Sequence, residues 1–277
     1  MRISFPLITI IIGTRPEAIK LAPVIKELSL NNSFNIRVVL TGQHKELVDQ
    51  VLDLFSIKAD KNFNLMSESQ TLSQLTERIL RSLDTEFEKY PAQLVLVQGD
   101  TTTAFASALA AFYKRIPIGH VEAGLRTNNI YDPFPEEVNR RLISQMASLH
   151  FAPTEMSQKN LLESKVHGEV IKTGNTVIDA LMMLSEKVPK RNFFKEEFKN
   201  NRMILLTVHR RENRGKKLKD IAEGILLTLS KNKDVNFLIP LHPNPEVHNP
   251  LKEILGKHSR IKLSEPLDYF MMVSAIK

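Results

Sequence analysis

The sequence predicts an α/β protein of two units, each with a parallel β-sheet covered by helices. Short runs of β-branched and other apolar residues alternate with longer segments of helical periodicity through most of the chain. The predicted strands are continuously apolar, which is typical of strands buried on both faces of a parallel sheet. The length of 277 residues is long for one simple domain and sufficient for two domains.

The first unit is expected to cover residues 1–180. Its expected strands are Leu7–Ile12, Ile36–Leu40, Leu94–Gln98, Pro117–Val121, Leu149–Ala152 and Val170–Lys172. Helical periodicity predicts helices at about 17–30, 43–56, 70–89, 102–114, 136–147 and 156–164. The apolar run Ile3–Ile12 is too short to span a bilayer, and no small-residue cleavage site follows it. We therefore expect a buried strand there, a cytoplasmic protein and no membrane partner.

Residues 181–202, which include a stretch rich in Lys, Glu, Asn and Phe, are predicted to connect the units, and residues 203–277 to form the second one. The second unit's expected strands are Met203–Val208, Asn236–Leu241 and Arg260–Leu263, with helices at about 217–231, 247–256 and 267–276. A complete doubly wound domain usually needs roughly 100 residues or more. The second domain is therefore expected to be incomplete.

The composition and the absence of several motifs exclude or disfavour certain classes of active site, cofactor and partner. Lys and Arg number 38 against 31 Asp and Glu, and the net charge of +7 favours anionic partners such as nucleic acid or phosphorylated ligands. The absence of cysteine excludes disulfides, thiolate metal sites and a thiol nucleophile. No G-x-G-x-x-G, phosphate-loop or G-x-S-x-G pattern occurs, which disfavours NAD and serine-triad chemistry. The basic run His209–Lys217 lacks stacking aromatics, so we predict no nucleic-acid partner.

Polar residues follow several predicted strands, where open α/β sheets bind ligands. Arg15 and Lys20 begin the first helix, and there they suit either a diphosphate site or a turn with two solvated cations. Asp100 follows a strand and either caps the next helix or points into the ligand site. Glu122 follows the next strand with no evident structural duty. Glu136 opens a helix, where an acid is an ordinary partner of the helix dipole.

In the second unit, His209 follows the first predicted strand and His242 follows the second. If the two units face each other, one cleft would collect Arg15, Lys20, Asp100, Glu122, Glu136 and His209. Carboxylates and cations without a metal or hydride carrier suit proton transfer beside a phosphorylated leaving group. The sequence thus predicts an enzyme without a metal or cofactor.

Eight motifs in register resemble the bacterial and archaeal UDP-N-acetylglucosamine 2-epimerases of the non-hydrolysing family. They are GTRPEAIKLAP (13–23), TGQH (41–44), VQGDTTTAFASALAAFY (97–113), GHVEAGLRT (119–127), PFPEEVNRR (133–141), TGNTVIDAL (173–181), HRREN (209–213) and HPNP (242–245). The resemblance implies a glycosyltransferase-B-type fold, in which two Rossmann-like domains flank a cleft. It also implies a homodimer that interconverts UDP-GlcNAc and UDP-ManNAc and supplies ManNAc-type sugars for cell-surface polysaccharide.

The resemblance also implies the roles of single residues. Asp100, Glu122 and Glu136 match the family's acid/base carboxylates, and His209 matches the histidine beside the diphosphate. The implied substrate-binding residues are Arg15, Lys20, Gln43, His44, Arg210, His242, Leu267 and Met272. Three alternatives stay open: a hydrolysing 2-epimerase that releases UDP and ManNAc, an inactive truncated family member, and a glycosyltransferase of the same architecture. In the glycosyltransferase reaction, the three carboxylates would have no role.

Some positions depart from the family pattern. The family's D-S-G-G-x-x-E-E and R-x-x-T-E-R-P segments, which bind uridine and diphosphate, do not occur in this sequence. Met272 stands where an aromatic residue is usual, and Ser69 and Glu46 replace an arginine and a glutamine of a regulatory second site. We therefore expect weak turnover by the chain alone and an altered regulatory site.

Overall fold

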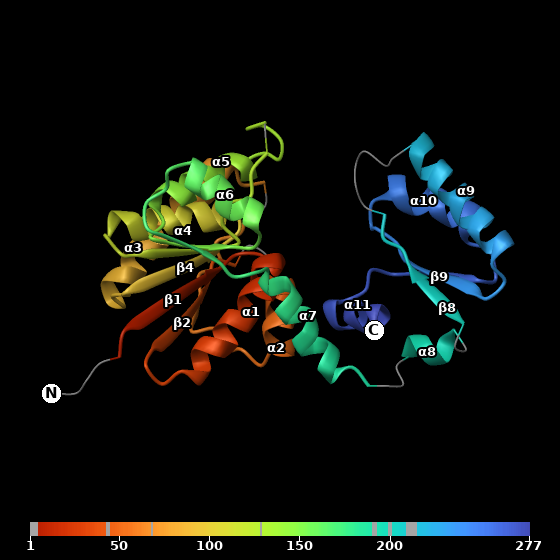
Figure 1. Ribbon diagram of the computed structural model, residues 1–277, viewed down its shortest axis with the longest axis horizontal. Coiled ribbons are helices and arrows are strands. Elements are labelled where there is room, and N and C mark those ends of the chain that lie inside the picture. Colours follow the sequence, from red (N-terminus) through yellow and green to blue (C-terminus); the bar gives the residue numbers. More distant parts are fainter. Residues whose placement is uncertain are drawn as a thin grey trace. The chain divides into compact units, whose positions relative to one another are not determined.

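The computed structural model describes residues 5–42, 45–67, 69–127, 129–189, 193–198, 201–208 and 215–277. The chain forms two compact units, Met1–Met183 and Leu184–Lys277, each with its own parallel sheet. Figure 1 shows both units, with the helices and some of the strands labelled. No helix in the described ranges is long and apolar enough to cross a membrane.

The first unit is a seven-stranded parallel sheet in the order β3-β2-β1-β4-β5-β6-β7. Its strands are β1 (Leu7–Ile12), β2 (Asn35–Leu40), β3 (Lys61–Asn62), β4 (Leu94–Gln98), β5 (Ile118–Val121), β6 (Leu149–Ala152) and β7 (Glu169–Lys172). Its helices are α1 (Arg15–Leu30), α2 (Lys45–Leu54), α3 (Leu72–Lys89), α4 (Thr102–Tyr113), α5 (Glu136–Met146) and α6 (Glu155–Glu163). Helices α1 and α2 cover one face of the sheet, and α3, α4 and α5 cover the other (Figure 1).

Strand β1 lies at the point where the winding of the sheet reverses, because its neighbours are β2 on one side and β4 on the other. Ile10 of β1 is level with Leu96 of β4, and Gln98 of β4 is level with Val121 of β5. The carboxyl ends of these three strands therefore meet at one edge of the sheet. In doubly wound proteins, ligands bind at this edge, beside the reversal point.

Close packing brings α4 against this edge. Helix α4 is rich in alanine, and its fully buried residues, including Ala106 and Ala108, let the neighbouring elements approach the helix closely. A Cβ atom on Gly13, directly after β1, would lie 2.4 Å from the hydroxyl oxygen of Thr103. A larger residue at this position would displace Thr103. Glycine therefore allows the turn after β1 to pack closely against the start of α4.

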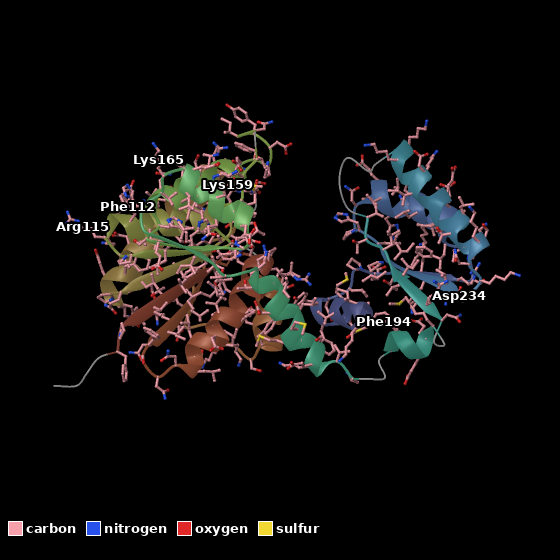
Figure 2. All side chains as sticks on the ribbon, viewed as in Figure 1. Phe112, Arg115, Lys159, Lys165, Phe194 and Asp234 are labelled. Carbon is pink, nitrogen blue, oxygen red and sulfur yellow. The ribbon has the colours of Figure 1, made fainter. Side chains whose placement is uncertain are left out.

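The second unit is a three-stranded parallel sheet in the order β10-β9-β8. Its elements are α8 (Phe193–Glu197), β8 (Arg202–Leu205), α9 (Lys216–Lys231), β9 (Val235–Pro240), α10 (Pro245–Leu255), β10 (Ile261–Ser264) and α11 (Tyr269–Ile276). Alternate residues of β9 enter different cores. Phe237 packs in the core that includes residues of α9 and α10, whereas Leu238 packs with Phe194 and Ala275 on the opposite face. Figure 2 labels Phe194, which lies on α8.

The predicted fold class is confirmed, and the predicted strands of the first unit agree with the structure to within one residue. Four elements, β3, α7, α8 and β8, differ most from the sequence prediction. The two-residue strand β3 is too short to leave a pattern. Helix α7 (Thr176–Lys187) begins in the first unit and ends in the second, and its buried residues Ala180 and Leu184 are spaced four apart. The segment predicted as a connection thus contains the end of α7 and all of α8, and β8 ends at Leu205, before the predicted Val208.

Candidate active site

The three carboxylates that the sequence singles out lie near one another at the carboxyl edge of the first sheet. Asp100 follows β4, Glu122 follows β5 and Glu136 is the first residue of α5. Burial raises the pKa of Asp100, and the nearby charges of Glu136 and Glu122 raise it further, whereas Arg140 opposes this shift. The loops after two adjacent strands and the start of one helix therefore bring the carboxylates within electrostatic range of one another.

Glu122 is held by side chains from helix α1, from strand β4 and from the loop before helix α7. Its Oε2 atom accepts hydrogen bonds from Lys20 Nζ at 2.5 Å and from Gln98 Nε2 at 2.6 Å, and its Oε1 atom accepts one from Asn175 Nδ2 at 2.9 Å. The backbone at Glu122 has a φ of 64°, a conformation that non-glycine residues rarely adopt. Observed strain of this kind clusters at functional sites. The three donors fix the direction of the Glu122 carboxylate.

The alternative role of Asp100 as a helix cap is wrong, because Thr101 caps α4. The Thr101 hydroxyl oxygen accepts a hydrogen bond from the backbone N–H of Ala104 at 3.0 Å. The Asp100 carboxylate instead pairs with Arg140, with Nη2 2.6 Å from Oδ2. Burial raises the pKa of the Asp100 carboxyl toward neutral pH. A group whose pKa is near the working pH can both give and take a proton.

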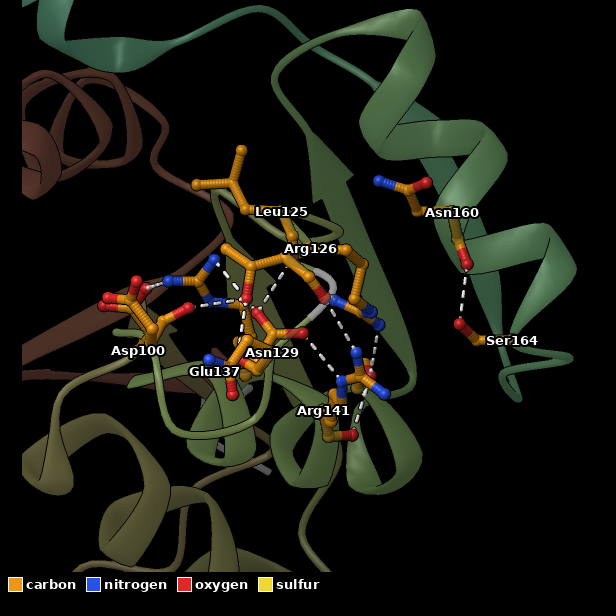
Figure 3. Close-up of polar contacts among 12 residues, drawn as sticks. Asp100, Leu125, Arg126, Asn129, Glu137, Arg141, Asn160 and Ser164 are labelled. Carbon is orange, nitrogen blue, oxygen red and sulfur yellow. Dashed lines mark hydrogen bonds and ion pairs between the residues drawn. The ribbon is translucent and has the colours of Figure 1, made fainter. Parts of the chain in front are cut away.

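Glu136 and Glu137 are neighbours in the sequence with different surroundings. The side chain of Glu136 is partly buried and makes no hydrogen bond or ion pair with other described residues. Glu137 is fully buried, and its oxygens accept hydrogen bonds from the Thr127 backbone N–H at 3.0 Å and from Arg141 Nε at 2.7 Å. Arg140 Nη1 lies 3.4 Å from Glu137 as well. Figure 3 shows the network around Glu137. Of the two adjacent acids, Glu136 is therefore the one whose carboxylate is available to contact a ligand.

The start of α1 differs from the simple diphosphate site considered above. The backbone N–H groups of Gly13 and Thr14 donate to Oε2 of Glu17 at 2.5 and 3.2 Å, so a carboxylate of the helix itself occupies them. Lys20 is paired with Glu122. Arg15 is partly buried and makes no hydrogen bond or ion pair within the described part of the chain. Of the groups predicted here for a diphosphate, Arg15 alone is left without such a partner.

The remaining predicted site residues fall into two groups. Gln43, His44, His209 and Arg210 are outside the described residues. In the second unit, His242 is exposed and its Nδ1 atom accepts a hydrogen bond from the backbone N–H of Asn244 at 3.1 Å. Leu267 packs at the edge of the core around Phe194, and Met272 is partly buried on α11.

Sequence reasoning did not single out four side chains around the carboxylates. Gln98 and Asn175 bond to Glu122, Arg140 pairs with Asp100, and Glu17 bonds to Thr101 beside Asp100. Gln98 ends a strand and Asn175 belongs to the motif at 173–181, so position alone could have drawn attention to both. A fifth residue, the buried His120, bonds through Nε2 to the Gly99 carbonyl oxygen at 2.7 Å, directly before Asp100. Burial lowers the pKa of His120 to about 4, so its ring is neutral at neutral pH.

A doubly wound parallel sheet with carboxylates at its reversal point, followed by a second parallel sheet, defines an α/β enzyme of the glycosyltransferase-B type. A family model described as UDP-N-acetylglucosamine 2-epimerase matches residues 26–277. The chain belongs to this family, whose named members are isomerases.

Individual relatives agree with the family model. The UDP-N-acetylglucosamine 2-epimerase of Neisseria meningitidis is 48% identical over 272 residues, which cover 95% of this chain and 73% of the relative. The solved structure of UDP-GlcNAc 2-epimerase from Neisseria meningitidis bound to UDP-GlcNAc has a TM-score of 0.85 and 47% identity, covering 98% of this chain and 75% of that one. S. aureus MnaA, solved with UDP, has a TM-score of 0.83 and 42% identity, with coverage of 97% and 71%.

Proposed function

We propose that this chain interconverts UDP-GlcNAc and UDP-ManNAc by removing the C2 proton and eliminating UDP, without hydrolysing the nucleotide sugar. The observation that carries the proposal is the group of three carboxylates with different surroundings. Glu122 accepts three hydrogen bonds, Asp100 has a raised pKa, and Glu136 has no hydrogen-bonding partner among the described residues. Reversible proton transfer at carbon needs one group that takes a proton and another that returns it.

The chemistry balances as an elimination followed by an addition. A carboxylate takes the C2 proton, the C2–H electron pair forms the C1–C2 double bond, and the C1–O bond breaks so that its electrons leave with UDP. The intermediate is 2-acetamidoglucal. A protonated carboxyl then returns a proton to the opposite face of C2, and the UDP oxygen bonds again to C1. Glu122, held by three donors, suits proton removal, and Asp100, with its raised pKa, suits proton return.

The leaving group needs positive charge, since the C2 hydrogen is only weakly acidic and departure of UDP must assist its loss. Relatives of this chain have been solved with UDP-GlcNAc and with UDP. We infer that this chain takes the same class of ligand and that Arg15 contacts its phosphates. The roles of His209, Arg210, Gln43, His44, His242, Leu267 and Met272 remain predictions, as does the supply of ManNAc-type sugars for polysaccharide.

Incubation of the chain with UDP-GlcNAc in heavy water tests the proposal. Proton NMR should show UDP-ManNAc and deuterium at C2 of both nucleotide sugars. Free ManNAc with UDP would instead support the hydrolysing reaction. Turnover without deuterium at C2 would exclude proton abstraction and contradict the proposal. Glu77→Gln is a matched control, because Glu77 is an exposed acid that contacts only Arg81 among the described residues.

A further inference from the structure

One buried carboxylate joins two loops at the reversal point of the sheet. The side chain of Glu17 lies in the first turn of α1, and the residue is 1% exposed. Its Oε2 atom accepts the hydrogen bonds from Gly13 and Thr14 described above, in the loop after β1. Its Oε1 atom accepts a hydrogen bond from the hydroxyl of Thr101 at 2.5 Å, in the loop after β4. Thr101 directly follows Asp100 in the sequence.

The two loops have no short covalent connection. Glu17 and Thr101 are 84 residues apart, and two strands and two helices separate β1–α1 from β4 along the chain. Their relative position therefore depends on packing and on side-chain contacts that cross from one loop to the other. The close approach of Gly13 to the side chain of Thr103 places the loop after β1 against the start of α4. The two oxygens of Glu17 accept hydrogen bonds from both loops at this junction.

This contact is costly, which argues that it does more than fill space. Burial raises the pKa of Glu17, meaning that the folded protein disfavours the charged form relative to water. An apolar side chain could cover the same surface of α1 without that penalty. Thr101 also caps α4 through the same hydroxyl oxygen, without any need for Glu17. What an apolar residue could not do is bond both loops at once in a directional way.

We propose that Glu17 is a positioning residue, which uses one buried carboxylate to fix the loop that carries Arg15 against the loop that carries Asp100. The inference rests on the proposed function, because it concerns the groups assigned there to phosphate binding and proton transfer. It also explains the start of α1: the helix amides hold an internal carboxylate, so the anion of a ligand is met by side chains rather than by these amides.

Two variants of the full chain test the proposal. Glu17→Ala removes both bonds, and Glu17→Gln keeps one acceptor oxygen and the volume. We expect kcat for C2 exchange to fall on the order of tenfold or more in Glu17→Ala, with little change in KM, because misplacement affects the transition state more than binding. Glu17→Gln should lie between this variant and the unchanged chain. A larger effect on KM than on kcat would contradict the proposal.

A second measurement does not depend on activity. Amide hydrogen exchange in Glu17→Ala should become faster at residues 13–14 and also at 100–102, while the far end of α4 at Lys114 keeps its rate. Formate or acetate can occupy the space left by the carboxylate and should restore protection in both loops. Glu86→Ala is the control, because Glu86 is a buried carboxylate that pairs with Arg37 instead. Formate should not change the two loops in that variant.

The outcomes distinguish the positioning role of Glu17 from the proposed epimerase function. Faster exchange confined to residues 13–14, with 100–102 unchanged, would overturn the positioning role whatever the activity. Should Glu17→Ala fail to fold, the exchange pattern of Glu17→Asp decides instead, because the shorter side chain withdraws both oxygens, and faster exchange is expected in both loops. Absence of C2 exchange in the unchanged chain would contradict the proposed function alone, since the coupling between the loops is measured without substrate.

Discussion

Lys20 Nζ and Glu122 Oε2 lie 2.5 Å apart, although 102 residues separate them in the sequence. The sequence suggested a phosphate-binding role for the lysine and a proton-transfer role for the glutamate. Under the proposed function, a diphosphate that attracts Lys20 would weaken one of the three bonds that hold the Glu122 carboxylate. The ion pair would then link substrate binding to the group proposed as the proton acceptor.

Replacing Asn175 by Asp should lower turnover. Asn175 Nδ2 donates to Glu122 Oε1 at 2.9 Å, so Asn175→Asp replaces a donor with a second carboxyl group. This change removes one of the three bonds that fix the direction of the Glu122 carboxylate, so kcat should fall on the order of tenfold. Asn31→Asp, at an exposed position outside the site, is the control and should keep its kcat. An unchanged kcat in Asn175→Asp would show that this bond does not contribute to turnover.

Removing Arg140 should destabilise the first unit. Its guanidinium is nearly buried and contacts both Asp100 at 2.6 Å and Glu137 at 3.4 Å. Arg140→Gln leaves two carboxylates without this partner, and breaking a buried pair in this way costs about 3–5 kcal/mol. Urea unfolding followed by circular dichroism measures the change. Arg81→Gln breaks an exposed pair on α3 and should alter the midpoint little. Equal midpoints for the two variants would refute the structural role of Arg140.

Much of the fold could be predicted because its signals are local. The run Leu7–Ile12 is apolar at nearly every position, and the structure buries Ile10, Ile11 and Ile12 completely or almost so. Helix α7 escaped prediction because it begins with Thr176, Val177 and Ile178, whose branched side chains do not favour a helix. The buried spacing of its later residues became visible only in three dimensions.

The site could be predicted only where strand ends mark it. Asp100 and Glu122 each follow an apolar strand, and sheet geometry alone brings such positions together. Glu136 and Glu137 look alike in sequence. Only the fold shows that Arg140 and Arg141, one turn later on α5, and the backbone of Thr127 all contact Glu137 and not Glu136. Glu17 reads as an ordinary acid in a first helical turn, and its partner Thr101 is too distant in sequence to suggest a bond.

The neutral buried His120 should make stability depend on pH. Its pKa falls from 6.5 to about 4 in the folded protein, chiefly through burial. Between these values the unfolded chain binds a proton that the folded chain does not, so stability is present above pH 6.5 and is lost as the pH falls toward 4. The loss attributable to His120 should be on the order of 3 kcal/mol, at about 1.4 kcal/mol for each pH unit.

Urea unfolding at several pH values between 4 and 7 checks this expectation. His120→Gln lacks the titrating ring, so its stability should fall less steeply with acid than that of the unchanged chain. His242→Gln, which alters an exposed histidine of the second unit, should keep the original pH dependence. Parallel curves for the unchanged chain and His120→Gln would show that His120 does not titrate as its burial requires.

The adjacent acids Glu136 and Glu137 offer the sharpest separation of chemistry from structure. Glu136→Gln removes a charge that has no hydrogen-bonding partner among the described residues, so turnover should fall on the order of 100-fold while the urea midpoint stays nearly unchanged. Glu137→Gln disturbs a fully buried acceptor of three groups and should lower stability by about 1–3 kcal/mol. The two changes are identical in chemistry and one residue apart. Near-normal turnover in a folded Glu136→Gln variant would reduce Glu136 to a partner of the helix dipole.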